Sequence, residues 1–262
     1  MAAARDIEVE RRELEAEAFA SPDAVARVGL VMLSTDATTE TDFGRLVAGE
    51  GVLVHGNRIT FENPTTPESL AATGPRLAAA AADLLPGSSF AAIYFACTSA
   101  SAVLGEAGVA AAVHAAKPDT PVVTPMSAAI AALRAVGARR FSVLAPYSPE
   151  VTARVTAPFT AAGFAIDRVT CWGLADDREM GRVRPEVIVE EAVTAIGPTA
   201  DALFISCTAL RAAAVVASIE ARIGRPVVTS NQAAAWVCRA HAGQSRPLPS
   251  ASRLFSLPFP AG

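Results

Sequence analysis

Two segments of this sequence share one design and end in the same pair of residues. Residues 90–100 read FAAIYFACTSA, and residues 201–210 read DALFISCTAL. A short run of apolar and aromatic residues is typical of a strand buried on both faces of a parallel sheet. Both runs close on Cys-Thr, at the end of the strand where open α/β sheets bind their ligands. Two such strands restrict the chain to an α/β fold with two comparable ligand-binding edges.

The similarity extends beyond these two strands. The Cys-Thr pairs are 110 positions apart, and the PVVT of residues 121–124 returns 105 positions later at 226–229. Residues 28–34 have a weaker counterpart 113 positions further on, at 141–147. A period of this length indicates a duplicated domain and not a solenoid. We therefore predict two similar domains whose cysteine-bearing strand ends face a common cleft.

Apolar runs alternate with Ala-rich stretches of helical character along most of the chain. This alternation predicts an α/β fold of two similar domains, each a parallel sheet flanked by helices, related by a pseudo-two-fold duplication. The 262 residues are enough for two such domains. We expect an appendage over residues 1–24, the first domain over 25–137, the second over 138–243, and a Pro-rich tail, docked or disordered, over 244–262.

Four predicted elements border the candidate site. Residues 51–55 are expected to form a short strand, and the Ala-rich residues 70–85 a single helix. Helices over residues 103–116 and 210–223 are expected to follow the two Cys-Thr pairs. Each helix start would then place backbone N–H groups beside its Cys-Thr pair.

Composition narrows the classes of partner, cofactor and location. The formal net charge is −4 with both signs interspersed, so we expect neither a nucleic-acid nor a membrane partner. The four cysteines show no Cys-x-x-Cys spacing, so no metal site is expected, and disulfides are not expected in a chain without an export signal. No run reaches the ~18 apolar residues of a spanning helix. The cytoplasm is the expected location.

Cys97 and Cys207 are the candidate catalytic residues. Each ends a predicted strand and precedes a predicted helix, whose N-terminal field favours the thiolate. A buried structural thiol is the alternative for either residue alone, because free cysteine is among the most buried residue types. Two Cys-Thr pairs at equivalent places favour a site. Cys171 and Cys238 lack this context and are expected in the core.

Hydroxyl groups accompany the two cysteines. Thr98, Ser99 and Thr208 place hydroxyls beside backbone N–H groups, which suits a carboxylate or the enediolate that forms when a proton or CO₂ leaves the adjacent carbon. Tyr147, at the equivalent strand end of the second half, is either a phenolic donor in the site or a loop tyrosine bonded to backbone. The polar residues 34–40, STDATTE, form either a binding loop or a helix cap.

Five motifs occur in one order along residues 27–242. They are STDATTE at 34–40, CTS at 97–99, PY at 146–147, CT at 207–208 and PVVTSNQ at 226–232. In this combination the chain resembles the aspartate/glutamate racemase superfamily, and within it the branch of maleate cis–trans isomerase and arylmalonate decarboxylase. NPTTPE at 63–68 and DDREM at 176–180 also resemble the ectoine-utilisation proteins of this branch.

The resemblance implies two similar α/β domains with an active site between them, a small carboxylic acid as substrate, and neither cofactor nor metal. It implies that Cys97 is the nucleophile or base and that Cys207 is the proton donor. In the decarboxylase pattern only the second cysteine is kept. The hydroxyls that would hold the substrate are those of Ser34, Thr98, Ser99, Tyr147 and Thr208.

Asp36 departs from the isomerase pattern, which has Asn at this place. A carboxylate there would repel a second substrate carboxylate and would pair with an ammonium or amide group. We therefore count Asp36 among the substrate-binding residues and expect an amino-acid-like or N-acylated substrate.

Three functions follow from these observations. The first is a cofactor-independent isomerase or racemase of a small carboxylic acid, in which both cysteines act. The second is a maleate isomerase or an arylmalonate-type decarboxylase, although the presence of both cysteines counts against the decarboxylase. The third is a non-catalytic small-molecule-binding protein. A homo-oligomer is expected in each case.

Overall fold

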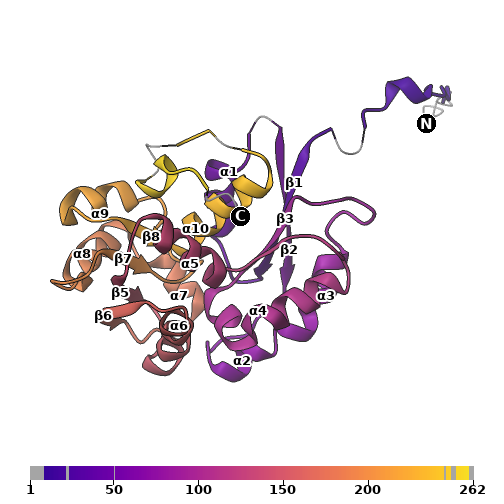
Figure 1. The fold of residues 1–262 in the computed structure, drawn as a ribbon. Coiled ribbons are helices and arrows are strands. Elements are labelled where there is room, and N and C mark those ends of the chain that lie inside the picture. Colours follow the sequence, from indigo (N-terminus) through magenta and orange to yellow (C-terminus); the bar gives the residue numbers. More distant parts are fainter. Residues whose placement is uncertain (1–8, 22–23, 50, 245, 249–251, 260–262) are drawn as a thin grey trace, which may run out of the picture.

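The computed structural model describes residues 9–21, 24–49, 51–244, 246–248 and 252–259. These residues form two four-stranded sheets with helices packed around them (Figure 1). The strand orders are β2-β1-β3-β4 and β6-β5-β7-β8, and every neighbouring pair is parallel. The identical order in both sheets confirms the predicted α/β class and the duplication.

The first sheet and its helices come from the first half of the chain. Its strands are β1 (Ala26–Leu33), β2 (Val52–Ile59), β3 (Ala92–Ala96) and β4 (Val122–Val123). The accompanying helices are α1 (Thr39–Leu46), α2 (Pro67–Ala71), α3 (Gly74–Ala82), α4 (Thr98–His114) and α5 (Pro125–Ala135). All five residues of β3 are buried, as its apolar run predicted.

The second half repeats this plan. Its strands are β5 (Arg140–Ala145), β6 (Ala165–Cys171), β7 (Ala202–Ile205) and β8 (Val227–Thr229). Its helices are α6 (Pro149–Ala161), α7 (Asp177–Arg182), α8 (Pro185–Ala195), α9 (Val216–Ile223) and α10 (Ser230–His241). β7 is buried along its whole length, so the two cysteine-bearing strands are both interior strands of their sheets.

Aromatic side chains fill the core on each side. In the first domain the rings of Phe43 and Tyr94 stack with centroids 5.1 Å apart. In the second, Phe159 contacts Phe141 and Phe204 edge to face, both at 5.1 Å. Burial of each such ring contributes roughly 1.5–3 kcal/mol, so these clusters hold each sheet against its helices.

Two element predictions need correction. Strand β2 continues to Ile59 because it pairs with β1 along its full length, which supplies hydrogen bonds that its polar sequence does not predict. The predicted helix over 70–85 is divided into α2 and α3. The hydroxyl of Thr73 donates to the Leu70 carbonyl at 2.6 Å, and Gly74-Pro75 then starts a new helix, since proline has no N–H to continue the old one.

The last helix crosses from one half of the molecule to the other. α10 follows β8 of the second sheet but packs against α1, α5 and β3 of the first domain. The domain boundary near residue 137 therefore stays a prediction, because the two halves share this helix as a common packing element.

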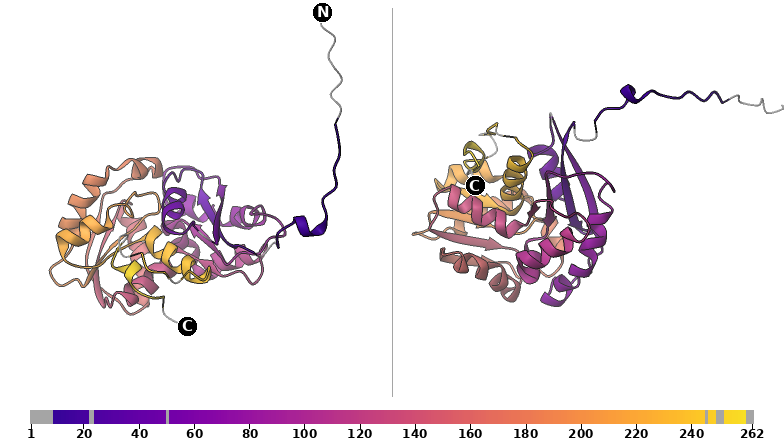
Figure 2. Two further views of the ribbon diagram at one scale, coloured as in Figure 1. Left: turned by 90° about the horizontal axis from the view of Figure 1, so that it is seen from above. Right: turned by 45° about the vertical axis from the view of Figure 1, so that its right-hand side comes forward.

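The two ends of the chain behave differently. Residues 9–21 extend away from the body and contain only the 3₁₀ turn η1 (Ala16–Ala18) (Figure 2). The tail is docked where it is described: η2 (Leu254–Ser256) buries Leu254 and Phe255. None of the helices among the described residues has the length and apolar character needed to cross a bilayer.

Candidate functional site between the two domains

The carboxyl ends of β3 and β7 meet at one junction. Thr208, after β7, donates its hydroxyl to the carbonyl of Ala96 in β3 at 3.1 Å. Ser230, the first residue of α10, accepts hydrogen bonds from the Thr98 hydroxyl at 2.9 Å and from the Cys207 N–H at 3.2 Å. One serine thus links the first Cys-Thr pair to the second, and both pairs lie at the same buried junction between the domains.

Cys97 caps the first turn of α4. Its sulfur accepts a hydrogen bond from the N–H of Ala100 at 3.4 Å and lies 3.6 Å from the Ser99 hydroxyl. Helix α4 begins at Thr98, five residues earlier than predicted, so the expected helix start beside this cysteine is present. Burial nevertheless outweighs the hydrogen bonds from Ala100 and Ser99. It raises the pKa of the Cys97 thiol to about 12, so the side chain, only 4% exposed, is a neutral thiol at pH 7.

Cys207 is held in a strained backbone conformation. Its φ is +100°, in the region that favours glycine, at a cost on the order of 1–3 kcal/mol. The helix predicted over 210–223 begins only at Val216, because residues 208–215 turn around the cleft. The start of the helix that follows in sequence, α9, does not lie beside this cysteine, so that prediction was wrong. The turns instead direct the N–H groups of Ala209 and Leu210 at its sulfur.

The environment of Cys207 also favours the neutral thiol. Burial raises the pKa of the group, which is 5% exposed, and the nearby charge of Asp177 raises it further. Hydrogen bonds from Tyr147 and from two backbone N–H groups oppose this rise. Each cysteine therefore starts as a proton donor, and one must lose its proton before it acts as a base or nucleophile.

The Tyr147 hydroxyl lies at the junction, where its partners are side chains and not backbone groups. Its ring is buried, and its hydroxyl accepts a hydrogen bond from Ser206 at 3.4 Å and bonds to Cys207. Burial raises the pKa of Tyr147, and the Cys207 and Cys97 groups add to the rise. Both cysteines thus influence the Tyr147 hydroxyl, which favours the prediction of a phenolic donor in the site.

The hydroxyls of the two threonines are engaged within the protein. Thr98 donates to Ser230, and Thr208 donates to Ala96. A hydroxyl has one proton to donate, so these two groups join the domains in this structure and their role at a carboxylate stays a prediction. The Ser99 and Tyr147 hydroxyls and the N–H groups of the Cys207 loop contact the two sulfurs instead, so these are the donors nearest the thiols.

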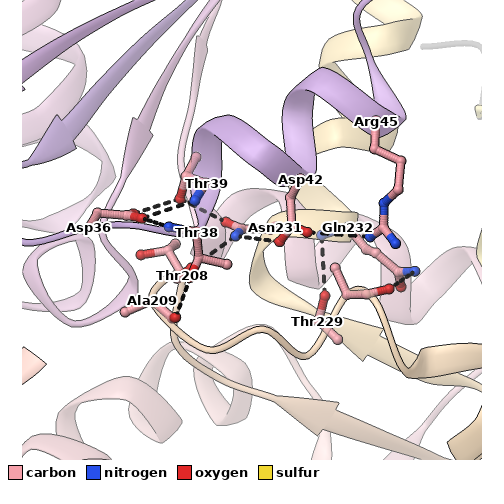
Figure 3. A network of polar contacts seen from close by, with 11 residues as sticks. Asp36, Thr38, Thr39, Asp42, Arg45, Thr208, Ala209, Thr229, Asn231 and Gln232 are labelled. Carbon is pink, nitrogen blue, oxygen red and sulfur yellow. Dashed lines mark hydrogen bonds and ion pairs between the residues drawn. The ribbon is translucent and has the colours of Figure 1, made fainter. Parts of the chain in front are cut away.

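Asp36 caps α1. Its Oδ1 accepts from the N–H groups of Thr38 and Thr39 at 2.8 and 2.9 Å, and its Oδ2 accepts from the Thr39 hydroxyl at 2.6 Å (Figure 3). The Thr38 hydroxyl in turn donates to the Ala209 carbonyl of the Cys207 loop at 2.7 Å. Burial raises the pKa of Asp36 in spite of these bonds. Residues 34–40 are thus a helix cap that also contacts the site, and substrate binding by Asp36 stays a prediction.

Ser34 is not brought to the thiols. Its side chain is exposed, and its hydroxyl accepts from the N–H of Phe61 at 3.1 Å, beyond the end of β2. The neighbouring Thr35, in the turn after β1, reaches the interdomain junction instead and donates its hydroxyl to Asp177.

Asp177 is a site residue that the sequence reasoning did not single out. It begins α7, is 8% exposed, and accepts a hydrogen bond from the Thr35 hydroxyl at 2.6 Å. Burial raises its pKa to about 6, and the charge of Asp36 adds to the rise. The signal available was the DDREM motif, which placed an acid after β6 but gave no indication that it would face the first domain.

Asn231 is the second such residue. Its Nδ2 donates to Asp42 Oδ2 and to the Thr208 carbonyl, both at 2.9 Å, and its Oδ1 accepts from the hydroxyls of Thr39 and Tyr94, both at 3.4 Å (Figure 3). One amide therefore joins α1, β3 and the Cys207 loop. The signal available was the PVVTSNQ motif at 226–232, which contains Asn231 but assigned it no role.

Asp42→Asn is expected to flatten the pH dependence of stability. Burial raises the pKa of Asp42 from its usual 3.8 to about 6, against the hydrogen bond from Asn231 and the ion pair with Arg45. The folded state holds this proton more tightly than the unfolded state, so the group's contribution is complete below pH 3.8 and is lost as pH rises through 6. At pH 7.5 the variant should be more stable than wild type by on the order of 1–3 kcal/mol in urea unfolding.

Arg45→Gln is the matched variant, because it removes only the partner cation. It should raise the pKa of Asp42 and steepen the fall in stability between pH 5 and 7.5. An unchanged pH profile for Asp42→Asn would contradict the assignment of this titration to Asp42.

The fold and the junction place the chain among the two-domain α/β enzymes of the aspartate/glutamate racemase superfamily, as the five motifs indicated. The chain belongs to the arylmalonate decarboxylase family, because residues 65–255 match the sequence model of that family. It is 28% identical over 226 residues to maleate isomerase from Nocardia farcinica, covering 81% of this chain and 88% of that protein. It is 29% identical over 138 residues to arylmalonate decarboxylase from Bordetella bronchiseptica, covering 52% and 58%.

Solved structures agree with these similarities. A cysteine-to-serine variant of the Nocardia farcinica maleate cis–trans isomerase, with a covalently bound succinylcysteine intermediate, superposes with a TM-score of 0.81 at 25% identity, over 88% of this chain and 98% of that one. A liganded double variant of arylmalonate decarboxylase superposes with a TM-score of 0.78 at 26% identity, over 88% and 99%.

Proposed function

We propose that the protein is a cofactor-independent isomerase or racemase of a small carboxylic acid, in which Cys97 and Cys207 act from opposite sides of the substrate. The observation that carries this proposal is the junction at Ser230, which links the Cys97 strand end to the Cys207 backbone. This junction holds the two cysteine-bearing strand ends of opposite domains together, which supports a two-base reaction at a single carbon.

In the racemase scheme, one cysteine takes the α-proton as thiolate while the other gives its proton to the opposite face. The electron pair of the broken C–H bond moves into the carboxylate, which becomes an enediolate. Donors that face this charge stabilise it: the Ser99 and Tyr147 hydroxyls and the N–H groups of the Cys207 loop. The proton given up by the second cysteine replaces the one taken by the first, so the enzyme ends with its two protonation states exchanged.

In the isomerase scheme, the Cys97 thiolate adds to one alkene carbon and Cys207 protonates the other. The resulting single bond rotates, and elimination of Cys97 with return of the proton to Cys207 restores the double bond in the other geometry. The succinylcysteine intermediate of the Nocardia farcinica enzyme supports covalent addition as a chemistry this fold accommodates.

A decarboxylase is the second candidate. It is favoured by the match of residues 65–255 to the arylmalonate decarboxylase family. There the C–C bond to one carboxylate breaks, CO₂ leaves, and the carbanion takes its proton from Cys207. This reaction needs only one thiol, and Cys97 would then have no chemical step.

Incubation in D₂O with a panel of acids separates these functions. The panel holds amino acids, N-acetyl diamino acids, maleate and arylmalonates, followed by NMR. Deuterium at the α-carbon identifies a racemase, fumarate formed from maleate identifies the isomerase, and CO₂ release identifies the decarboxylase. A ligand-induced rise in melting temperature without any of these products would contradict a catalytic role and support a binding protein.

Substrate entry requires the cleft to open. Both thiols are almost fully covered, and the loop before α7 is bonded to the first domain through Thr65 N–H to the Ala175 carbonyl at 2.7 Å. Location in the cytoplasm and homo-oligomerisation remain predictions.

A further inference from the structure

Asp177 differs from the other buried acids near the site in what its carboxylate bonds to. Both oxygens of Asp36 accept hydrogen bonds from its own loop. Asp42 is bonded to Asn231 and ion-paired with Arg45 at 3.3 Å. Asp177 Oδ2 accepts from Thr35, but its Oδ1 accepts no hydrogen bond from the part of the chain that the structure describes.

No cation of the described residues balances the charge of Asp177. The nearest arginine in sequence, Arg178, is exposed and pairs with Asp176 at 2.7 Å. None of the other ion pairs among the described residues includes Asp177. A buried carboxylate with a spare oxygen and no counter-charge is costly, and such groups are normally paired.

Two side chains of the first domain hold Asp177 in place. Asn63 of the first domain accepts from the Asp177 N–H at 3.0 Å and donates to Asp176 at 2.7 Å. The Thr35 bond comes from the end of β1. β1 pairs with β3 as far as Ala96, the residue before Cys97, so the Thr35 bond places Asp177 at the strand ends that carry this cysteine. The charge of Asp177 also raises the pKa of both Cys97 and Cys207.

We propose that Asp177, positioned by Thr35, is the subsite for a cationic nitrogen of the substrate. The inference rests on the function proposed above and narrows it: the substrate is a zwitterion with one carboxylate and one ammonium group, and not a dicarboxylate. The ammonium supplies the missing counter-charge and a donor for Oδ1. A second carboxylate at the same place would meet a like charge in a poorly solvated site.

The variant Asp177→Asn keeps the shape and an acceptor for Thr35 but removes the charge. Binding is measured by calorimetry at pH 7.5 with three probes: 2-aminobutyrate, butyrate as its nitrogen-free analogue, and fumarate as a dicarboxylate. Wild type should prefer 2-aminobutyrate over butyrate by at least tenfold, and the variant should lose this preference. Fumarate should bind the variant at least tenfold more tightly than wild type.

A pH series adds a second measurement. In wild type the affinity for fumarate should rise as pH falls from 7.5 to 5.5, because Asp177 takes up a proton with a pKa of about 6. The groups that face Asp177 are the neutral Thr35 and Asn63, the acids Asp36 and Asp176, and the two thiols. Asp177→Asn should abolish most of this rise. Asp83→Asn, which removes an exposed charge, should behave like wild type.

The outcomes separate this inference from the proposed function. If Asp177→Asn binds all three probes as wild type does, while serine at Cys97 or Cys207 abolishes turnover, the subsite is wrong and the two-thiol reaction stands. If wild type binds fumarate more tightly than 2-aminobutyrate, the substrate class is wrong. If neither cysteine is needed for turnover, the proposed function fails whatever Asp177 does.

Discussion

Cys97→Ser and Cys207→Ser should each lower kcat by about 10³-fold in a racemase or isomerase, because a serine hydroxyl is a far weaker acid and nucleophile than a thiol. Both side chains are nearly buried, and serine is close to cysteine in size, so the folded state should persist. Deuterium exchange into each enantiomer of the substrate measures the effect directly. Each variant should lose exchange from one enantiomer while retaining part of the exchange from the other, since one base remains.

The pattern across the two variants distinguishes the candidate reactions. A decarboxylase would tolerate Cys97→Ser and lose activity only with Cys207→Ser. Cys238→Ser is the matched control, because this cysteine is fully buried in α10 and has no place in the cleft. Equal activity in wild type and both site variants would rule out thiol chemistry.

Asn231→Leu should destabilise the protein by about 3–5 kcal/mol, the largest stability effect expected here. Leucine fills a similar volume but leaves the Asp42 carboxylate, the Thr208 carbonyl and the Tyr94 hydroxyl buried without their partner. Because Thr208 follows Cys207, the loss should also disturb the site. Urea unfolding measures the first effect, and turnover at a temperature where the variant is folded measures the second.

Asn57→Leu provides the comparison for this variant. Asn57 lies half-buried on β2, donates to the Ala80 carbonyl at 2.9 Å, and accepts from the exposed N–H of Arg58 at 2.8 Å. Its replacement should cost only about 1 kcal/mol and leave turnover unchanged. If both asparagines cost the same, the junction network around Asn231 does not carry the interdomain packing.

The strand that ends at Cys97 and its duplicate at Cys207 could be predicted because their signals are local. A buried strand needs only a short apolar run, and the position of Cys-Thr after that run fixes which edge of the sheet it occupies. The parallel order of the strands followed from the alternation with helices. These predictions required no knowledge of which side chains touch across the domains.

The parts that failed depended on distant residues. β2 continues to Ile59 because β1 pairs with it. Residues 208–215 leave the helical path because the Cys207 loop closes against Ala96 and Ser230. Burial of the thiols belongs to the same class: a helix start is visible in a sequence, whereas the burial that raises the pKa of Cys97 is not.

The sequence by itself determined two parallel α/β domains and the two cysteines at their strand ends, because strand burial and duplication are written in contiguous residues. Only the tertiary structure decided which polar groups complete the site. It turned Ser34 outward, brought Asp177 from the second domain to Thr35 of the first, and placed Asn231 between α1 and the Cys207 loop. Thr35 and Asp177 are 142 residues apart, and Asp42 and Asn231 are 189 residues apart. A hydrogen bond between such residues depends on ångström-scale placement that no local pattern specifies.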